Sequence, residues 1–141
     1  MRIPLKGDAI EFSNGSSVLY SVPWIDVSLT SNHKMGPSIN CYIDTGATVT
    51  VFPSDYAFGF LGYSELSLKK GIRINLMGVG GSLALGYGHI CTINHPEFCI
   101  ENSLIFFVDN QPFPLLGRIG FMDKFKKIIF DEENKTLEFV R

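Results

Sequence analysis

Asp44, Thr45 and Gly46 are the residues of this sequence whose types and spacing are best suited to chemistry. They follow an alternation of apolar residues that is typical of a strand, so the Asp44 carboxylate should lie at the edge of an apolar core. A glycine two residues after an aspartate lets the backbone turn sharply, and amide groups can then donate hydrogen bonds to the carboxylate. The same tripeptide is also an ordinary turn sequence, and it should occur by chance in roughly a few per cent of chains of this length.

Hydrolysis of a peptide bond by carboxyl groups requires two of them around one water molecule. One is ionised and takes a proton from the water, while the other is protonated and donates to the substrate carbonyl. Two carboxyl groups about 3 Å apart cannot easily both ionise, so they share one proton. No other aspartate of the sequence is followed by Thr-Gly or Ser-Gly. A two-fold homodimer that pairs two copies of Asp44 is the simplest completion of such a site, and it requires no metal or organic cofactor.

The elements that must position this carboxylate are mostly strands. Alternating or β-branched residues predict them, and they cover residues 25–30, 39–43, 48–52, 72–76, 83–89, 104–108, 127–130 and 136–140. Ser54 begins a short predicted helix that ends before Gly62, and a helical period over residues 118–126 predicts another. Gly78, Gly80 and Gly81 predict the tip of a hairpin. Many short strands separated by Gly and Pro are typical of an all-β protein.

This order of elements resembles the retropepsin family of aspartic proteases, notably its bacterial and cellular members. Residues 41–47 resemble the active-site motif of the family, and residues 77–81 resemble its flap tip. Residues 115–118 resemble its second motif, two apolar residues followed by glycine, which passes the active-site loop. The resemblance extends over roughly residues 20–140. It implies an all-β, retropepsin-like closed barrel or sandwich with a flap hairpin, one short C-terminal helix and a homodimeric assembly.

The resemblance also implies roles for individual residues. Catalysis would fall to Asp44, Thr45 and Gly46, with Thr45 of each subunit bonding across the dimer. The residues expected to bind substrate are Ala47, Met77, Gly78, Val79, Gly80 and Gly81. The second motif, with a structural role, consists of Leu115, Leu116, Gly117 and Arg118. The substrate would be a protein or peptide bound in extended form. The implied activity is that of an aspartic endopeptidase.

Thr48 departs from the pattern of the family. Many retropepsins have a second acidic residue at this position, which pairs with the arginine of the later motif and contacts the substrate backbone. The ion-pair partner of Arg118 is therefore left open, and so are substrate contacts at Thr48. The chemistry expected of Asp44 does not depend on either residue.

Length and composition predict one domain, residues 20–141, preceded by residues 1–19 as a candidate dimer-interface strand. The terminal strands are also candidates for an intersubunit sheet.

A net charge of −2 without a basic cluster argues against a nucleic-acid partner. No apolar run approaches the roughly 18 residues of a membrane helix, and Met1–Phe12 lacks the apolar stretch of a signal peptide. Three cysteines without a C-x-x-C spacing fit reduced thiols, so a soluble, cytoplasmic protein is expected.

Other function classes have weaker support in the sequence. A metal site could be sought at His89, Cys91, His95 and Cys99, but their spacing is not a common zinc pattern and no metal is predicted. No motif of a serine or cysteine hydrolase occurs. The alternative from another class is a catalytically silent module that binds peptides or dimerises on the same fold, because a fold does not guarantee activity. The intact sequence of residues 44–47 favours the enzyme.

Overall fold

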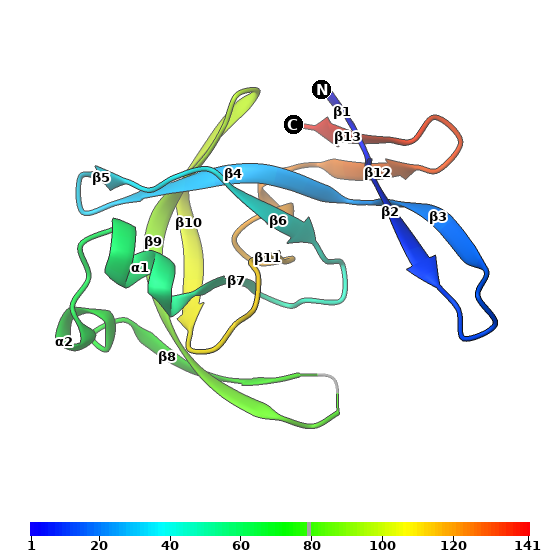
Figure 1. Cartoon of the computed structure of the whole chain (residues 1–141). Helices are drawn as coiled ribbons and strands as arrows, with labels where there is room; N and C mark the ends of the chain where they lie inside the picture. Colours follow the sequence, from blue (N-terminus) through cyan, green and yellow to red (C-terminus); the bar gives the residue numbers. More distant parts are fainter. Residues whose placement is uncertain (79) are drawn as a thin grey trace.

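The computed structural model describes residues 1–78 and 80–141, and short strands dominate it (Figure 1). The strands are β1 (Arg2–Pro4), β2 (Lys6–Glu11), β3 (Ser17–Val22), β4 (Trp24–Ser31), β5 (Lys34–Met35), β6 (Ile39–Ile43), β7 (Thr50–Pro53), β8 (Ile72–Met77), β9 (Leu83–His95), β10 (Phe98–Val108), β11 (Leu115–Leu116), β12 (Lys127–Asp131) and β13 (Thr136–Val140). The helices are α1 (Ser54–Phe60), α2 (Glu65–Leu68) and a 3-10 helix, Met122–Lys124. No helix among the described residues is long and apolar enough to cross a membrane.

A closed barrel forms the body of the molecule. Eight strands hydrogen-bond in the order β5–β4–β6–β11–β7–β10–β9–β8, and an additional pairing of β4 with β9 closes the sheet. Successive side chains of a strand point to opposite faces, so every second residue enters the interior. Its largest fully buried side chains are Phe52, Phe107, Phe121, Ile25, Leu29 and Ile43. The predicted all-β, closed architecture is confirmed.

Two short helices cover part of the barrel. α1 corresponds to the helix predicted from Ser54, and it ends at Leu61 before Gly62, whose φ of +73° suits glycine. α2 was not predicted. The side chain of Ser64 accepts a hydrogen bond from the Ser67 amide and begins this single turn.

Residues 118–126 form less helix than their period predicted, because only the 3-10 helix is present. Gly120 has a φ of +95°, which interrupts a right-handed helix at its start. Phe121 and Phe125, whose spacing suggested a helical face, pack edge to face with ring centroids 5.4 Å apart. Their spacing therefore reflects an aromatic cluster in the core rather than a regular helix.

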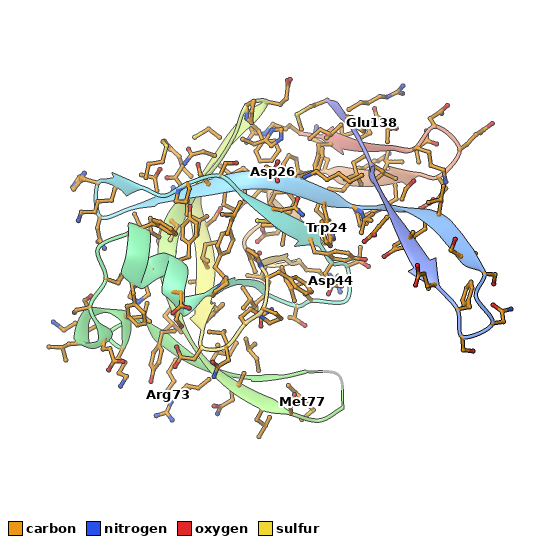
Figure 2. All side chains as sticks on the ribbon, in the orientation of Figure 1. Trp24, Asp26, Asp44, Arg73, Met77 and Glu138 are labelled. Atoms are coloured by element: carbon orange, nitrogen blue, oxygen red, sulfur yellow. The ribbon has the colours of Figure 1, made fainter. Side chains whose placement is uncertain are left out.

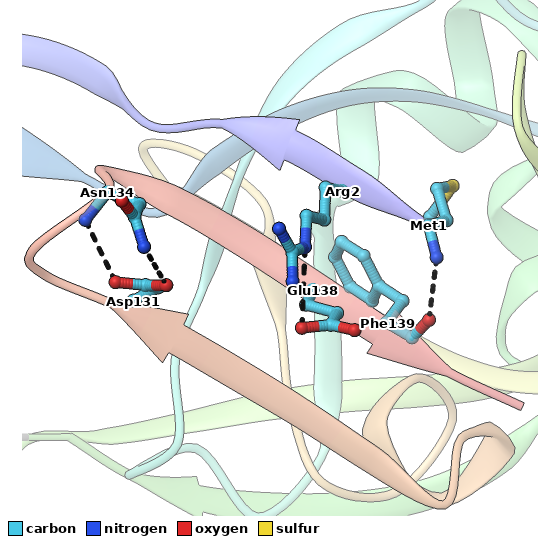
Figure 3. A network of polar contacts seen from close by, with 6 residues as sticks. All are labelled: Met1, Arg2, Asp131, Asn134, Glu138 and Phe139. Atoms are coloured by element: carbon cyan, nitrogen blue, oxygen red, sulfur yellow. Dashed lines mark hydrogen bonds and ion pairs between the residues drawn. The ribbon is translucent and has the colours of Figure 1, made fainter.

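The two ends of the chain meet in a second, three-stranded sheet with the order β1–β13–β12. The Met1 amino group donates to the Phe139 carbonyl oxygen at 3.2 Å, and Arg2 lies 3.6 Å from the Glu138 carboxylate (Figure 3). Hydrogen bonds from Asn134 hold the turn between β12 and β13. The terminal strands thus pair within one chain, and their role in an intersubunit sheet stays a prediction.

The strands β2 and β3 form a third sheet of their own, a hairpin that extends away from the barrel (Figure 1). We call this hairpin, residues 6–22, the arm. The predicted boundary between residues 19 and 20 lies inside β3, which runs from Ser17 to Val22. The assignment of residues 1–19 to a dimer interface stays a prediction.

Candidate active site

Asp44 directly follows β6, at the start of the loop that leads to β7 (Figure 2). Its half-buried carboxylate accepts a hydrogen bond from the Gly46 amide, with 2.8 Å between Oδ1 and nitrogen. The backbone holds the loop from both sides, since the Asp44 amide donates to Leu116 and the Ala47 amide donates to the Asp44 carbonyl oxygen. The carboxylate therefore has a fixed position and a charge-assisted hydrogen bond.

The segment that braces this loop comes from far along the chain. β11 lies between β6 and β7, parallel to β6 and antiparallel to β7. Beyond β11, the amides of Arg118 and Ile119 each donate to the loop at 2.9 Å, to the carbonyl oxygens of Ala47 and Thr48. We call residues 44–51, together with residues 115–120, the crossing.

The two segments of the crossing come very close together at Gly117. A side chain there would overlap the carbonyl oxygen of Val49, and it would lie 2.9 Å from that of Ala47. Backbone oxygens cannot move aside cheaply, so the position requires glycine. This gives a steric reason for the glycine of the apolar-apolar-glycine motif.

The Thr50 side chain joins the two segments of the crossing through hydrogen bonds. Its side chain is fully buried, its hydroxyl accepts a hydrogen bond from the Gly117 amide at 3.1 Å, and it donates to the Ile119 carbonyl oxygen at 2.9 Å. Sequence reasoning placed Thr50 in a strand but gave it no role at the site. The available signal was a hydroxyl-bearing residue between two valines, a few positions after Asp44.

The hairpin of β8 and β9 carries the predicted flap. Its strands pair from Ile72 opposite Gly88 to Met77 opposite Leu83, and Met77 is exposed near the tip. Gly80 has a φ of +90° and Gly81 a φ of +82°, which favour glycine. The amide of Gly78 donates to the Ser82 carbonyl oxygen at 2.8 Å and closes the turn. Val79, also predicted to bind substrate, lies outside the described residues.

An apolar cluster lies between the root of this hairpin and the crossing. Its buried members come from β7, from the loop before it and from the end of β10, and they are Val49, Val51, Phe106 and Val108. Ile74, Leu76 and Ala84 of the hairpin pack against them. The hairpin of β8 and β9 is thus packed against β7, the loop before it and β10 of its own chain.

Solved structures provide the decisive comparison, because no family model and no curated protein matches the chain. A retropepsin-like aspartic protease from Rickettsia conorii matches with a TM-score of 0.59 and 19% identity, over 95% of this chain and 91% of that chain. The chain has a retropepsin-like fold. The EIAV protease, solved in complex with the inhibitor HBY-793, matches with a TM-score of 0.50 and 24% identity, over 69% of this chain and 82% of that chain. At these identities the likeness establishes the fold.

Two residues with predicted roles at the site, Thr45 and Arg118, face solvent in the single chain. The side chain of Thr45 is exposed, and so is that of Arg118. Within the described part of the chain, no ion pair is formed by Arg118, and Thr48 beside it is exposed as well. The bond of Thr45 across a dimer stays a prediction.

His89, His95, Cys41 and Cys91 are packed or hydrogen-bonded within the barrel. His89 lies 2.7 Å from the Leu68 carbonyl oxygen, and His95 stacks on Phe98, where burial lowers the pKa of its imidazole. Burial raises the pKa of the Cys91 thiol to about 11 and that of Cys41 further still, so both thiols remain protonated near neutral pH. Over residues 1–78 and 80–141, no group of three or more His, Cys, Asp or Glu residues is arranged to hold a metal ion.

Three cavities found among the described residues are not lined by Asp44. A cavity of about 450 Å³ lies between the start of the chain and β4, where its lining includes Lys6, Trp24 and His95 but not Asp44.

Proposed function

We propose that this chain is an aspartic endopeptidase that acts as a homodimer, with one Asp44 carboxylate from each copy. The observation that carries the proposal is the Asp44 loop, in which a carboxylate with an amide donor is braced by the residues 115–120 within a retropepsin-like fold. The fold neighbour from Rickettsia conorii is an aspartic protease. The sequence has no second Asp-Thr-Gly or Asp-Ser-Gly, so the second carboxylate is assigned to another copy.

The two Asp44 carboxyl groups hold one water molecule and one proton between them. The ionised carboxylate removes a proton from the water, which attacks the carbonyl carbon of the scissile peptide bond. The protonated carboxyl group donates its proton to the carbonyl oxygen, and a tetrahedral diol forms. Proton transfer to the amide nitrogen then breaks the C–N bond. The Gly46 amide keeps each carboxylate oriented during these steps.

The flap hairpin closes over an extended substrate in this proposal. Glycines at positions 78, 80 and 81 leave the tip backbone accessible, so that its amides can bond to the substrate main chain. Ala47, in the Asp44 loop, and Met77, near the tip of the hairpin, would contact the substrate from opposite sides. Closure would exclude bulk water and order the substrate beside the carboxyl pair.

Replacement of Asp44 tests the catalytic assignment. Asp44→Asn keeps the shape of the side chain but removes the base, so cleavage of a peptide library at about pH 4 to 7 should fall by at least about 10²–10⁴-fold in kcat/KM. Asp55→Asn is the matched control, because Asp55 is an exposed residue in the first turn of α1. Wild-type activity should rise and fall with pH, since one carboxyl group must be ionised and the other protonated.

Two outcomes would contradict the enzymatic proposal. Equal, near-zero cleavage by a dimeric wild type and by Asp44→Asn would favour the silent binding module. Failure of a statine-type transition-state mimic to inhibit the observed cleavage would point to another catalyst in the preparation. The homodimer is tested separately by sedimentation together with activity across dilution, because a monomer that cleaves peptides at every dilution would exclude a shared site.

A further inference from the structure

The arm has no support from the barrel along most of its length. All six residues of β2 are exposed, and so are the first four of β3. Among the described residues, these two strands pair only with each other. A two-stranded hairpin that packs on nothing is only marginally stable in water. The arm therefore lacks the packing that would define its position in a single chain.

One face of the arm carries exposed apolar side chains toward the turn, while Asp8 and Lys6 lie on the same face toward the base. Ile10 pairs with Val18, and Tyr20 lies two residues further along β3 on the same face. These side chains are 46%, 48% and 39% exposed, and Phe12 extends the stripe toward the turn with 48% exposure. Contiguous apolar surface on a thin projection is a mark of an interaction site.

The base of the arm lies next to the Asp44 loop. Pro23 follows the arm directly, and its carbonyl oxygen accepts a hydrogen bond from Ile43, the residue before Asp44, at 2.9 Å. Trp24 pairs with Tyr42 in the adjoining register, and Figure 2 shows Trp24 and Asp44 close together below the base of the arm. A strand of six residues extends about 20 Å, so the arm reaches well beyond this point.

We propose that the arm is a clasp that docks, through its Ile10–Val18–Tyr20 face, onto a second copy of the chain. This inference rests on the homodimer of the proposed function. A second Asp44 can approach the first only if the second copy occupies the side of the barrel on which Asp44 opens. The arm ends at Val22, one residue before Pro23, which bonds to Ile43, and it projects from the side of the barrel on which Figure 2 labels Asp44. Two-fold symmetry makes the contact reciprocal, so each arm is covered by the partner copy.

A paired substitution on the apolar face tests the clasp. Ile10→Lys with Val18→Glu removes the apolar surface while it places opposite charges on directly paired residues, which preserves the hairpin. The dimer dissociation constant, measured by sedimentation, should rise by about tenfold or more. The matched control is Ala9→Lys with Leu19→Glu, since this pair lies on the opposite face and Leu19 is 85% exposed. The control should change the constant by less than about threefold. Circular dichroism checks the fold of both variants.

Hydrogen exchange of the unmodified chain gives an independent test. Amides of the arm should exchange slowly at protein concentrations that favour the dimer and much faster after dilution to monomer, while amides of the barrel core change little. Arm amides that exchange at one rate across this range would overturn the clasp. Slow exchange that appears only after another protein is added would overturn it as well, because the occupant would not be a second copy.

The outcomes separate the clasp from the proposed function. A wild type that dimerises and cleaves, with both paired variants dimerising equally well, would overturn the clasp and leave the endopeptidase intact. A wild type that dimerises through the arm but does not cleave would support the clasp and contradict the endopeptidase. A wild type that stays monomeric at every concentration would overturn the homodimer and the clasp together.

Discussion

The crossing and the arm both lie next to the Asp44 loop, but their strands are held in opposite ways. At the crossing, residues from two distant parts of the chain are fixed by backbone hydrogen bonds, by the buried hydroxyl of Thr50 and by the close approach at Gly117. In the arm, the strands bond to each other and expose both faces. The crossing is complete within one chain, whereas the arm has surface left to bury.

This difference fits the roles proposed for the two regions, namely a fixed site at the crossing and an assembly surface on the arm. The geometry of a catalytic group must be fixed before substrate arrives, so it is built from contacts that cannot be lost one at a time. A surface used for assembly must be accessible in the free subunit, so it cannot be packed against its own barrel. If this division holds, substitutions in the crossing should affect folding strongly, and similar substitutions in the arm should hardly affect the monomer.

The largest contrast is expected from glycine-to-alanine changes. Gly117→Ala forces a methyl group onto the Val49 carbonyl oxygen, so the free energy of unfolding should fall by about 3 kcal/mol or more. Gly7→Ala in β2 has nothing within 4 Å of the added carbon and should change it by less than about 0.5 kcal/mol. Urea denaturation at one low protein concentration measures both. A small loss for Gly117→Ala would show that the crossing is looser than its geometry suggests.

A smaller contrast is expected from the loss of single hydroxyl groups. Thr50→Val leaves the Gly117 amide without its buried acceptor, which should cost about 1–3 kcal/mol of unfolding free energy. Tyr20→Phe in the arm removes only an exposed hydrogen bond of 3.4 Å to Asp8 and should cost less than about 0.5 kcal/mol. Thermal denaturation under matched conditions compares them. Equal costs would contradict the division between the two regions.

The smallest effect is expected where the arm joins the barrel. Lys6 lies 3.1 Å from the Asp26 carboxylate, and the two side chains are 43% and 56% exposed. Such a pair is screened by water and salt, so Lys6→Met should lower the unfolding free energy by less than about 1 kcal/mol. The difference from wild type should shrink further in about 1 M NaCl. A loss above about 2 kcal/mol would mean that this contact, rather than the partner copy, fixes the arm.

Much of the barrel could be predicted because its signals are local. Alternating residues and glycine-containing turns predict strands over 72–76 and 83–89, which lie within β8 and the longer β9. The two strands of the arm were not predicted separately, because both of its faces are exposed and a strand without a buried face gives a weak period. The helix predicted over 118–126 was too long, since aromatic packing can produce the same spacing of apolar residues.

The sequence was sufficient to predict the residues of the candidate site, but not the distant contacts that hold the Asp44 loop in place. Asp44 and Gly46 stand two positions apart, so their contact could be anticipated from the sequence. β11 has only two residues, too few for any period, and its position came from the family resemblance alone. The role of Thr50 depends on a hydrogen bond to Gly117, and no local pattern reports a partner so distant in the chain.

The insertion of β11 between β6 and β7 has a consequence for synthesis of the protein. Strands β6 and β7 leave the ribosome well before Leu115 and Leu116, yet they cannot complete their shared ladder until these residues arrive. At about 5–20 residues per second, the nascent chain waits on the order of several seconds with two apolar strand edges uncovered. During this interval the uncovered strand edges can pair with other chains, so the growing polypeptide is exposed to aggregation.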